Sequence, residues 1–195
     1  MLLLIVGLVL FLGIHSVRMS APQWRTDFIA QRGELVYKSL YAVVSFLGLA
    51  LLIIGYGQSR TEPQYIWFPP VAMSHIAALL TLFAFVLLAA AYVPGNRIKA
   101  RVGHPMVLGV KVWAFSHLLA NGRLGDMILF GAFLAWAIIN YVKSRKADKA
   151  SGVVYSSKNS IAVDSITVVI GVGAWLIFAM WAHLKLIGVS PFAVG

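Results

Sequence analysis

Six long apolar runs, separated by short polar or basic segments, constrain this chain more than any other feature. They cover residues 1–17, 39–57, 70–93, 104–121, 125–142 and 162–182. Each run is close to the roughly 20 residues that a helix needs to cross a bilayer. The chain is 61% hydrophobic and only 11% charged, whereas soluble domains carry about 25% charged residues. We therefore expect an all-α fold, a polytopic transmembrane bundle of six helices in contact with the lipid bilayer.

The basic residues predict how these helices are oriented. The segments after the first, third and fifth runs hold twelve lysine and arginine residues, whereas the other loops and the C-terminal tail hold three. Basic residues collect in the cytoplasmic loops of membrane proteins. We therefore expect both termini to lie outside the cytoplasm, which in a bacterium means that they are periplasmic. This distribution also explains the net charge of +10 without nucleic acid as a partner.

We divide the chain near residue 145. Residues 1–145 are predicted to form a membrane domain of five helices, and residues 146–195 a basic cytoplasmic linker followed by the sixth transmembrane helix. The first run is uncharged and its charges follow it, which favours a retained helix over a cleaved signal peptide. The chain has no cysteine, so disulfides and thiol catalysis are excluded.

Four histidines lie within or at the ends of the apolar runs. In the predicted orientation, His15 and His104 lie near the cytoplasmic face, and His75 and His117 near the periplasmic face. An imidazole in hydrocarbon is costly and usually functional. Two imidazoles from facing helices at one depth suit axial ligation of a haem iron or of another metal. We predict His75 and His117 as ligands of a haem iron or another metal, with His15 and His104 as a second candidate pair.

Each of these histidines also has a simpler interpretation. His15 and His104 can be interfacial groups at helix ends, and His104 precedes Pro105, which is typical of a helix start. His75 and His117 can be packed side chains with one hydrogen bond each.

Trp113 and Asn121 share a helical stripe with His117 because they lie four residues before and after it. An indole and an amide on either side of the imidazole would wall a cofactor pocket and orient the ring. Packing for Trp113 and helix capping for Asn121 are the simpler roles.

The segment from His104 to Gly131, with HPM, WA, HLLANG and LFG at fixed spacing, resembles the NnrU family. Three further patterns agree with it, namely His15-Ser16-x-Arg18, Arg32-Gly33 with Tyr37 and Tyr41, and Met73-Ser74-His75. The similarity covers about residues 1 to 145. It implies a bacterial inner-membrane protein linked to nitrite and nitric oxide reduction. It also implies kinship with plastid zeta-carotene isomerase, a haem b protein that isomerises a double bond without net redox change.

In that isomerase the histidines that match His15 and His117 look like the haem ligands. The depth argument joins His117 to His75 instead, and we favour that pairing. The isomerase has a cysteine where this chain has Ala114. A mechanism that exchanges a thiolate ligand therefore does not carry over.

These observations define competing functions. The first is a haem b-binding membrane protein, isomerase-like or redox-active, that acts on a small lipophilic substrate such as a polyene. The alternative is a non-catalytic membrane accessory factor for the assembly or expression of denitrification enzymes. A channel or transporter is the weakest hypothesis, because the apolar runs lack mid-helix acids and paired repeats with broken helices. The apolar exterior also allows a homo-oligomer.

Overall fold

The computed structural model describes residues 1–158 and 160–192, and its regular elements in this part of the chain are helices. The elements are α1 Leu2–Ser20, α2 Pro22–Arg32, α3 Glu34–Ser59, α4 Val71–Tyr92, α5 Arg97–Val102, α6 Pro105–Ala120, α7 Leu124–Ala150 and α8 Ile161–Ile177. A π-helical turn, η1 Phe178–Ala182, and a short helix, α9 His183–Ile187, continue α8. The predicted all-α fold is confirmed.

Five of the expected transmembrane helices are long and apolar enough to cross a membrane. They are α1, α3, α4, α7 and the continuous stretch Ile161–Ile187. The remaining apolar helix, α6, has 16 residues, which corresponds to a length of about 24 Å against a hydrocarbon core of roughly 30 Å. Helix α6 is therefore shorter than its apolar run, residues 104–121, and shorter than the hydrocarbon core is thick.

Helices α3 and α7 extend beyond their apolar runs, and α5 lies outside the runs. Helix α3 begins at Glu34, and α7 continues through its basic residues to Ala150. Lysine, alanine and arginine favour helix once it has started, and Arg145 pairs with Asp148 at 3.6 Å within the last turns of α7. Helix α5 lies in a predicted loop, and its start is fixed by Asn96, whose side chain accepts from the backbone N–H of Lys99 at 2.7 Å.

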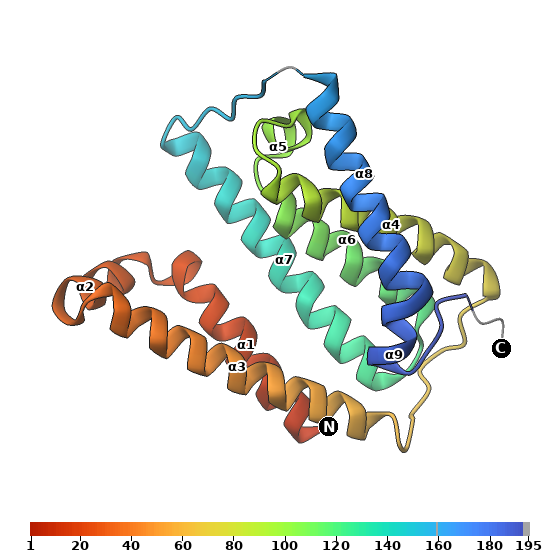
Figure 1. Cartoon of the computed structure of the whole chain (residues 1–195). Helices are drawn as coiled ribbons and strands as arrows, with labels where there is room; N and C mark the ends of the chain where they lie inside the picture. The colour runs from red at the N-terminus through yellow and green to blue at the C-terminus, as the bar shows by residue number, and fades with distance from the viewer. Residues whose placement is uncertain (159, 193–195) are drawn as a thin grey trace.

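The helices pack in the spatial order α3, α1, α7, α6, α4 and α8 (Figure 1). Helices α1 and α3 form one pair, and α7, α6, α4 and α8 form a larger group. The pair joins the larger group mainly through the contact of α1 with α7. An apolar cluster of Leu4, Leu8 and Leu52, with Ile128 and Phe133 against it, fills this junction.

Glycine allows α1 and α3 to approach each other closely. A Cβ atom built on Gly55 would lie 2.2 Å from the backbone nitrogen of Leu4, and one on Gly7 would lie 2.5 Å from the backbone nitrogen of Leu52. Such contacts require the absence of a side chain, as in other membrane helix pairs with small residues at the crossing.

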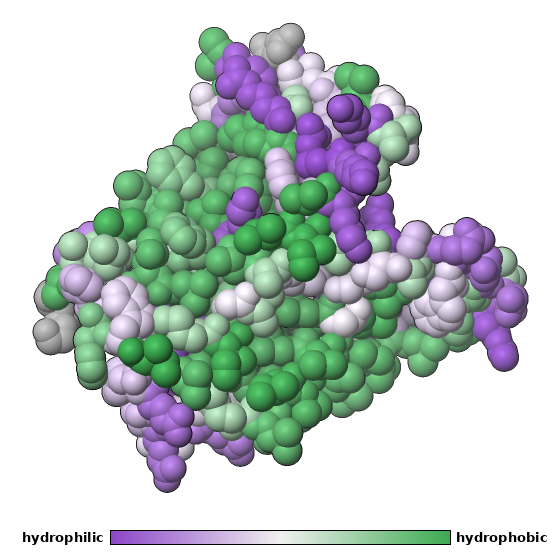
Figure 2. Space-filling view, turned by 180° about the vertical axis from the view of Figure 1, so that it is seen from behind, coloured by the Kyte–Doolittle hydropathy of each residue, from purple (hydrophilic) through white to green (hydrophobic). Residues whose placement is uncertain are grey.

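The two ends of the bundle differ in charge. The basic end carries the segments 18–38, 93–104 and 143–158, and the opposite end carries Met1, the 60–70 loop and Ile187. Figure 2 shows a broad apolar surface between hydrophilic side chains that gather toward its ends. Large apolar side chains such as Leu35, Phe46 and Phe83 are exposed along the helices. This surface suits contact with lipid rather than with water.

Candidate functional site

His15 lies in the last two turns of α1 and is held in one orientation. Its Nδ1 is 2.6 Å from the carbonyl oxygen of Phe11. Because a carbonyl only accepts, Nδ1 carries the proton and Nε2 keeps a lone pair. The ring packs against Phe11 and Tyr41, with centroid distances of 4.3 and 5.2 Å. This is the arrangement of an imidazole prepared to bind a metal through Nε2.

His117 has the same local arrangement on α6. Its Nδ1 lies 2.8 Å from the carbonyl oxygen of Trp113, so its Nε2 also keeps a lone pair. Phe130 of α7 and the indole of Trp113 contact the ring, with centroid distances of 4.6 and 5.2 Å. His117 therefore lies in an aromatic contact between α6 and α7.

Aromatic rings separate His15 from His117. Phe11 contacts Phe133 at 6.0 Å, and Phe133 contacts Trp113 at 5.5 Å. These three side chains form a continuous series of ring contacts between the two histidines. One iron atom would need both imidazole nitrogens within bonding distance. Among the described residues, no direct contact joins His15 to His117, so this pairing stays what the resemblance implies.

His75, near the start of α4, has an exposed side chain. In the part of the chain that the structure describes, no hydrogen bond or ring contact joins it to another residue, and none joins any two of the four candidate histidines. The predicted ligand pair of His75 and His117 therefore stays a prediction without a contact between its members. The same holds for His15 and His104.

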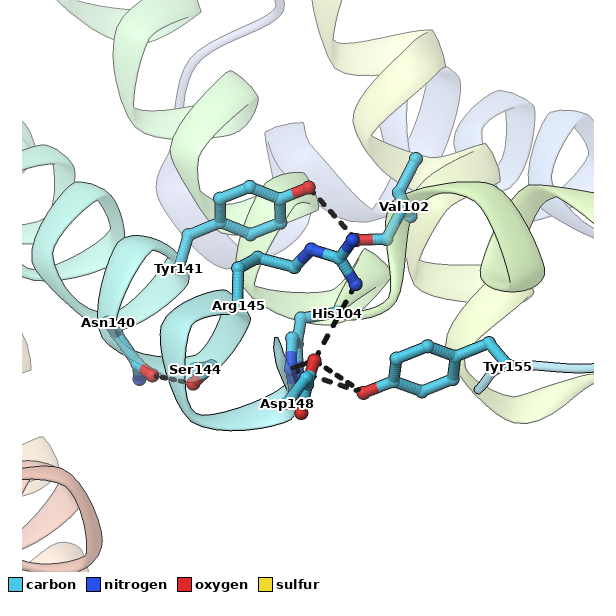
Figure 3. A network of polar contacts seen from close by, with 8 residues as sticks. All are labelled: Val102, His104, Asn140, Tyr141, Ser144, Arg145, Asp148 and Tyr155. Atoms are coloured by element: carbon cyan, nitrogen blue, oxygen red, sulfur yellow. Dashed lines mark hydrogen bonds and ion pairs between the residues drawn. The ribbon is translucent and has the colours of Figure 1, made fainter. Parts of the chain in front are cut away.

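His104 is engaged in a polar network at the basic end (Figure 3). Its Nε2 lies 2.8 Å from Oδ2 of Asp148 at the end of α7, and 3.2 Å from the hydroxyl of Tyr155. Tyr155 also donates to Asp148 at 3.0 Å. Figure 3 shows that Arg145 also reaches this carboxylate, with Nη1 3.6 Å from the same Oδ2 atom. Because a protein carboxylate occupies its Nε2, His104 is less available to a metal than His15 or His117.

Trp113 and Asn121 differ in how they relate to His117. Trp113 contacts the imidazole through both its carbonyl and its indole. Asn121 is the C-cap residue of α6, and its side-chain amide donates to the carbonyl oxygen of His117 at 2.8 Å. Asn121 thus has the capping role that was the simpler of its two interpretations, and its amide bonds the backbone of His117 and not its ring.

A hollow of about 260 Å³ lies where α1, α2 and α3 meet, and His15 lines it. Its other walls include Tyr37 and Tyr41 of α3. Cations from all three helices surround it, namely Arg18, Arg25 and Lys38. Sequence reasoning did not predict this grouping. The residue patterns at positions 15–18 and 32–41 that resemble NnrU contain several of its members, and this was the available signal.

A second polar network, at the end opposite the basic loops, was also not predicted. Asp126 is buried, with an exposed fraction of 1%, at the start of α7. It accepts from the hydroxyl of Tyr56 at 2.7 Å and from Nε of Arg123 at 3.2 Å. As the acidic residue in the first turn of α7, Asp126 also interacts favourably with the helix dipole. The network links α3 to α7, so its role in this structure is to hold the two groups of helices together.

Among the residues that the structure describes, no group of three or more His, Cys, Asp or Glu residues could hold a metal ion. A metal bound by protein ligands alone therefore has no evident site in this part of the chain. A cofactor that brings four ligands of its own, as a porphyrin does, needs only one or two imidazoles from the protein.

These features define the class: a polytopic helical membrane protein in which two histidines, His15 and His117, bond backbone carbonyls and pack against aromatic rings. The family description "NnrU protein" matches residues 3–191, and the chain belongs to the NnrU family. The match continues through the linker and the last helix, beyond residue 145, where the resemblance seen in the sequence ended. No curated protein and no solved structure matches the chain.

Proposed function

We propose that this NnrU-family protein binds haem b through a single axial ligand, Nε2 of His15, in the hollow between α1, α2 and α3. The observation that carries the proposal is the state of this imidazole. Its Nδ1 donates to Phe11, its Nε2 is left without a hydrogen-bond partner among the described residues, and the ring lines the hollow. A backbone carbonyl on the second nitrogen is the usual support of a metal-binding histidine.

The surroundings of His15 suit a flat aromatic ligand. Tyr37 and Tyr41 contact each other at 6.3 Å and line the hollow with His15. The hollow is open, so a ligand larger than 260 Å³ can extend beyond it. This donor set fits haem b better than it fits a bare metal ion.

Haem b held by His15 would supply an iron centre that binds a small molecule or exchanges one electron. The residues of this chain would orient the porphyrin through His15 and keep bulk water away with the two tyrosine rings. The remaining candidates, His75, His104 and His117, are not needed for this arrangement.

The substrate in this proposal is a small lipophilic molecule that reaches the hollow through the membrane. We place the protein in the bacterial inner membrane. Family membership supports a link to nitrite or nitric oxide reduction. The resemblance to zeta-carotene isomerase, which was seen in the sequence, supports an isomerase-like reaction as the alternative to a redox reaction.

The proposal is tested by the visible spectrum of the full-length protein purified after haem-replete expression. We expect a Soret band and, in a pyridine-haemochrome assay, one haem b per chain. His15→Ala should lose most of the haem, and added imidazole should restore the band by replacing the missing ligand. His75→Ala and His104→Ala should keep it. The elution volume in size-exclusion chromatography controls for folding of each variant.

Two results would overturn the proposal. The first is a wild-type protein without a Soret band, and the second is a His15→Ala variant with the wild-type spectrum and stoichiometry. A separate experiment tests the alternative function. If a deletion strain that expresses His15→Ala reduces nitrite or nitric oxide as well as one that expresses wild type, the protein acts as a non-catalytic accessory factor and not through haem.

A further inference from the structure

The hollow beside His15 has an excess of positive charge. Arg18 of α1, Arg25 of α2 and Lys38 of α3 line it together with a single acid, Glu34. Lys38 is paired with Glu34 at 3.0 Å. The two arginines form no ion pair with a carboxylate in the part of the chain that the structure describes. Two guanidinium groups, each from a different helix, therefore line one cavity without a carboxylate in ion-pair contact. Glu34, which pairs with Lys38, is the acid whose charge also acts on Arg25.

The position of Arg25 is set by an aromatic ring. Its guanidinium carbon lies 5.2 Å from the centre of the Tyr37 ring. Tyr37 is itself buried, with an exposed fraction of 8%. A guanidinium stacked on a tyrosine keeps its N–H groups free to bind an anion in the plane of the fork. Arg25 thus behaves as part of the wall of the hollow and not as a freely moving surface residue.

The imidazole and the arginines of the hollow lie at different distances from the basic end of the bundle. Arg18 follows His15 by three residues, so it lies about 4.5 Å nearer the basic end. Arg25 belongs to α2, which leads from that end of α1 back to α3. A ligand in the hollow would have its apolar part beside His15 and Ile14 and its anionic part at the basic end. This is the polarity of an amphiphile that lies in one leaflet of a membrane.

We infer that Arg18 and Arg25 bind the two carboxylates of haem b, an inference that rests on the proposed function. Haem b carries both carboxylates on one edge, and the two unpaired guanidinium groups match them in number and charge. A guanidinium binds a carboxylate with two parallel hydrogen bonds, which also fixes the direction of the ligand. The two arginines therefore decide how the porphyrin enters the hollow, and His15 binds its iron.

The inference is tested separately from iron ligation with iron-free protoporphyrin IX, which has the same carboxylates but no metal. Binding to full-length His15→Ala in detergent is followed by quenching of tryptophan fluorescence. We expect Arg18→Gln or Arg25→Gln, added to this variant, to weaken binding roughly tenfold or more, as loss of a charge-assisted hydrogen bond predicts. Arg32→Gln, which removes a cation of α2 outside the hollow, is the matched control and should leave binding unchanged.

The dimethyl ester of protoporphyrin IX separates carboxylate binding from apolar binding. The ester should bind His15→Ala as weakly as protoporphyrin IX binds the variant that combines His15→Ala with Arg18→Gln and Arg25→Gln. Equal binding of the acid and the ester, or an effect of Arg32→Gln as large as that of Arg18→Gln, would overturn the inference. Displacement of protoporphyrin by phosphatidylglycerol but not by phosphatidylcholine would assign the arginines to lipid headgroups and would also overturn it.

The two proposals fail in different ways. If the wild-type protein gives a Soret band that depends on His15 but not on the arginines, the proposed function stands and the carboxylate assignment falls. If protoporphyrin binding depends on the arginines but no haem spectrum appears, the site binds a dicarboxylate porphyrin without iron ligation, and the proposed function falls.

Discussion

Nε2 of His104 lies 2.8 Å from Oδ2 of Asp148, although the two residues are 44 positions apart in the chain. The contact joins the residue before α6 to the end of α7, and Tyr155 brings the linker onto both (Figure 3). A further bond, from the backbone N–H of Lys158 to the carbonyl of Gly95 at 2.9 Å, docks the same linker on the loop before α5. The basic linker is therefore attached to the bundle.

We predict that His104→Ala destabilises the basic end of the protein. The substitution leaves Asp148 with only Tyr155 and Arg145 as partners and removes the bond between α6 and α7. The melting temperature in detergent should fall, and trypsin should cut the linker faster. Lys149→Arg, in the same turn of α7, keeps both the charge and the trypsin site, so it is the control and should have neither effect. Equal cleavage rates in His104→Ala and wild type would contradict the prediction.

Tyr155 predicts a pH dependence at the alkaline end. Burial, and then the hydrogen bond to Asp148, raise the pKa of this phenol above its ordinary value of 10.0. The folded protein thus holds the phenol proton more tightly than the unfolded chain does. The resulting stability is fully present below about pH 10 and is lost as the pH rises through the raised pKa. The melting temperature of wild type should therefore fall more steeply above pH 10 than that of Tyr155→Phe, and parallel curves would refute this.

The crossing of α1 and α3 predicts a sharp difference between two nearby glycines. Gly55→Ala would place Cβ 2.2 Å from the backbone of Leu4, whereas Gly57→Ala meets nothing within 4 Å. Overpacking of this kind costs about 1–3 kcal/mol or more. We expect Gly55→Ala to lower the melting temperature strongly or to prevent accumulation in the membrane. Gly57→Ala is the control on the same helix, and equal behaviour of the two variants would show that the crossing is elsewhere.

The buried carboxylate of Asp126 should be the most sensitive polar group at the end opposite the basic loops. Asp126→Ala leaves the guanidinium of Arg123 and the hydroxyl of Tyr56 without their partner. Removal of one partner from a buried pair costs about 3–5 kcal/mol, and Tyr56→Phe should cost about 1 kcal/mol as the loss of one hydrogen bond. Chemical denaturation in mixed micelles measures both values. The exposed Asp27→Asn serves as control, and a cost below that of Tyr56→Phe would contradict the assignment.

The orientation predicted from twelve against three basic residues can be measured directly because the chain has no cysteine. Thr61 and Ser151 are exposed residues at opposite ends of the bundle. We expect Thr61→Cys to react with a membrane-impermeant maleimide in intact cells that have a permeabilised outer membrane. Ser151→Cys should react only after lysis. The reverse labelling pattern would invert the topology and place both termini in the cytoplasm.

Much of the fold was predicted from single segments of the sequence. Five apolar runs became helices long enough to cross a membrane, because transfer of a side chain into hydrocarbon depends mainly on that side chain and its neighbours in the helix. The ends were less well predicted. Helix α7 extends to Ala150, and α5 forms in a segment that was predicted to be a loop. Local capping and ion pairs stabilise helix in these polar segments, which hydropathy alone does not identify as helical.

The sequence by itself thus determined a membrane protein with six apolar helices, the side on which its charges gather, and which four histidines could bind a cofactor. Only the tertiary structure decided how those histidines differ. It left His75 exposed, gave His104 a carboxylate and anchored His15 and His117 on backbone carbonyls. Depth along a helix follows from counting residues, whereas the neighbours of a ring depend on which helices pack together. The partners that made this difference, Asp148 for His104 and Tyr41 of α3 for His15, are distant in the sequence from the histidines they contact.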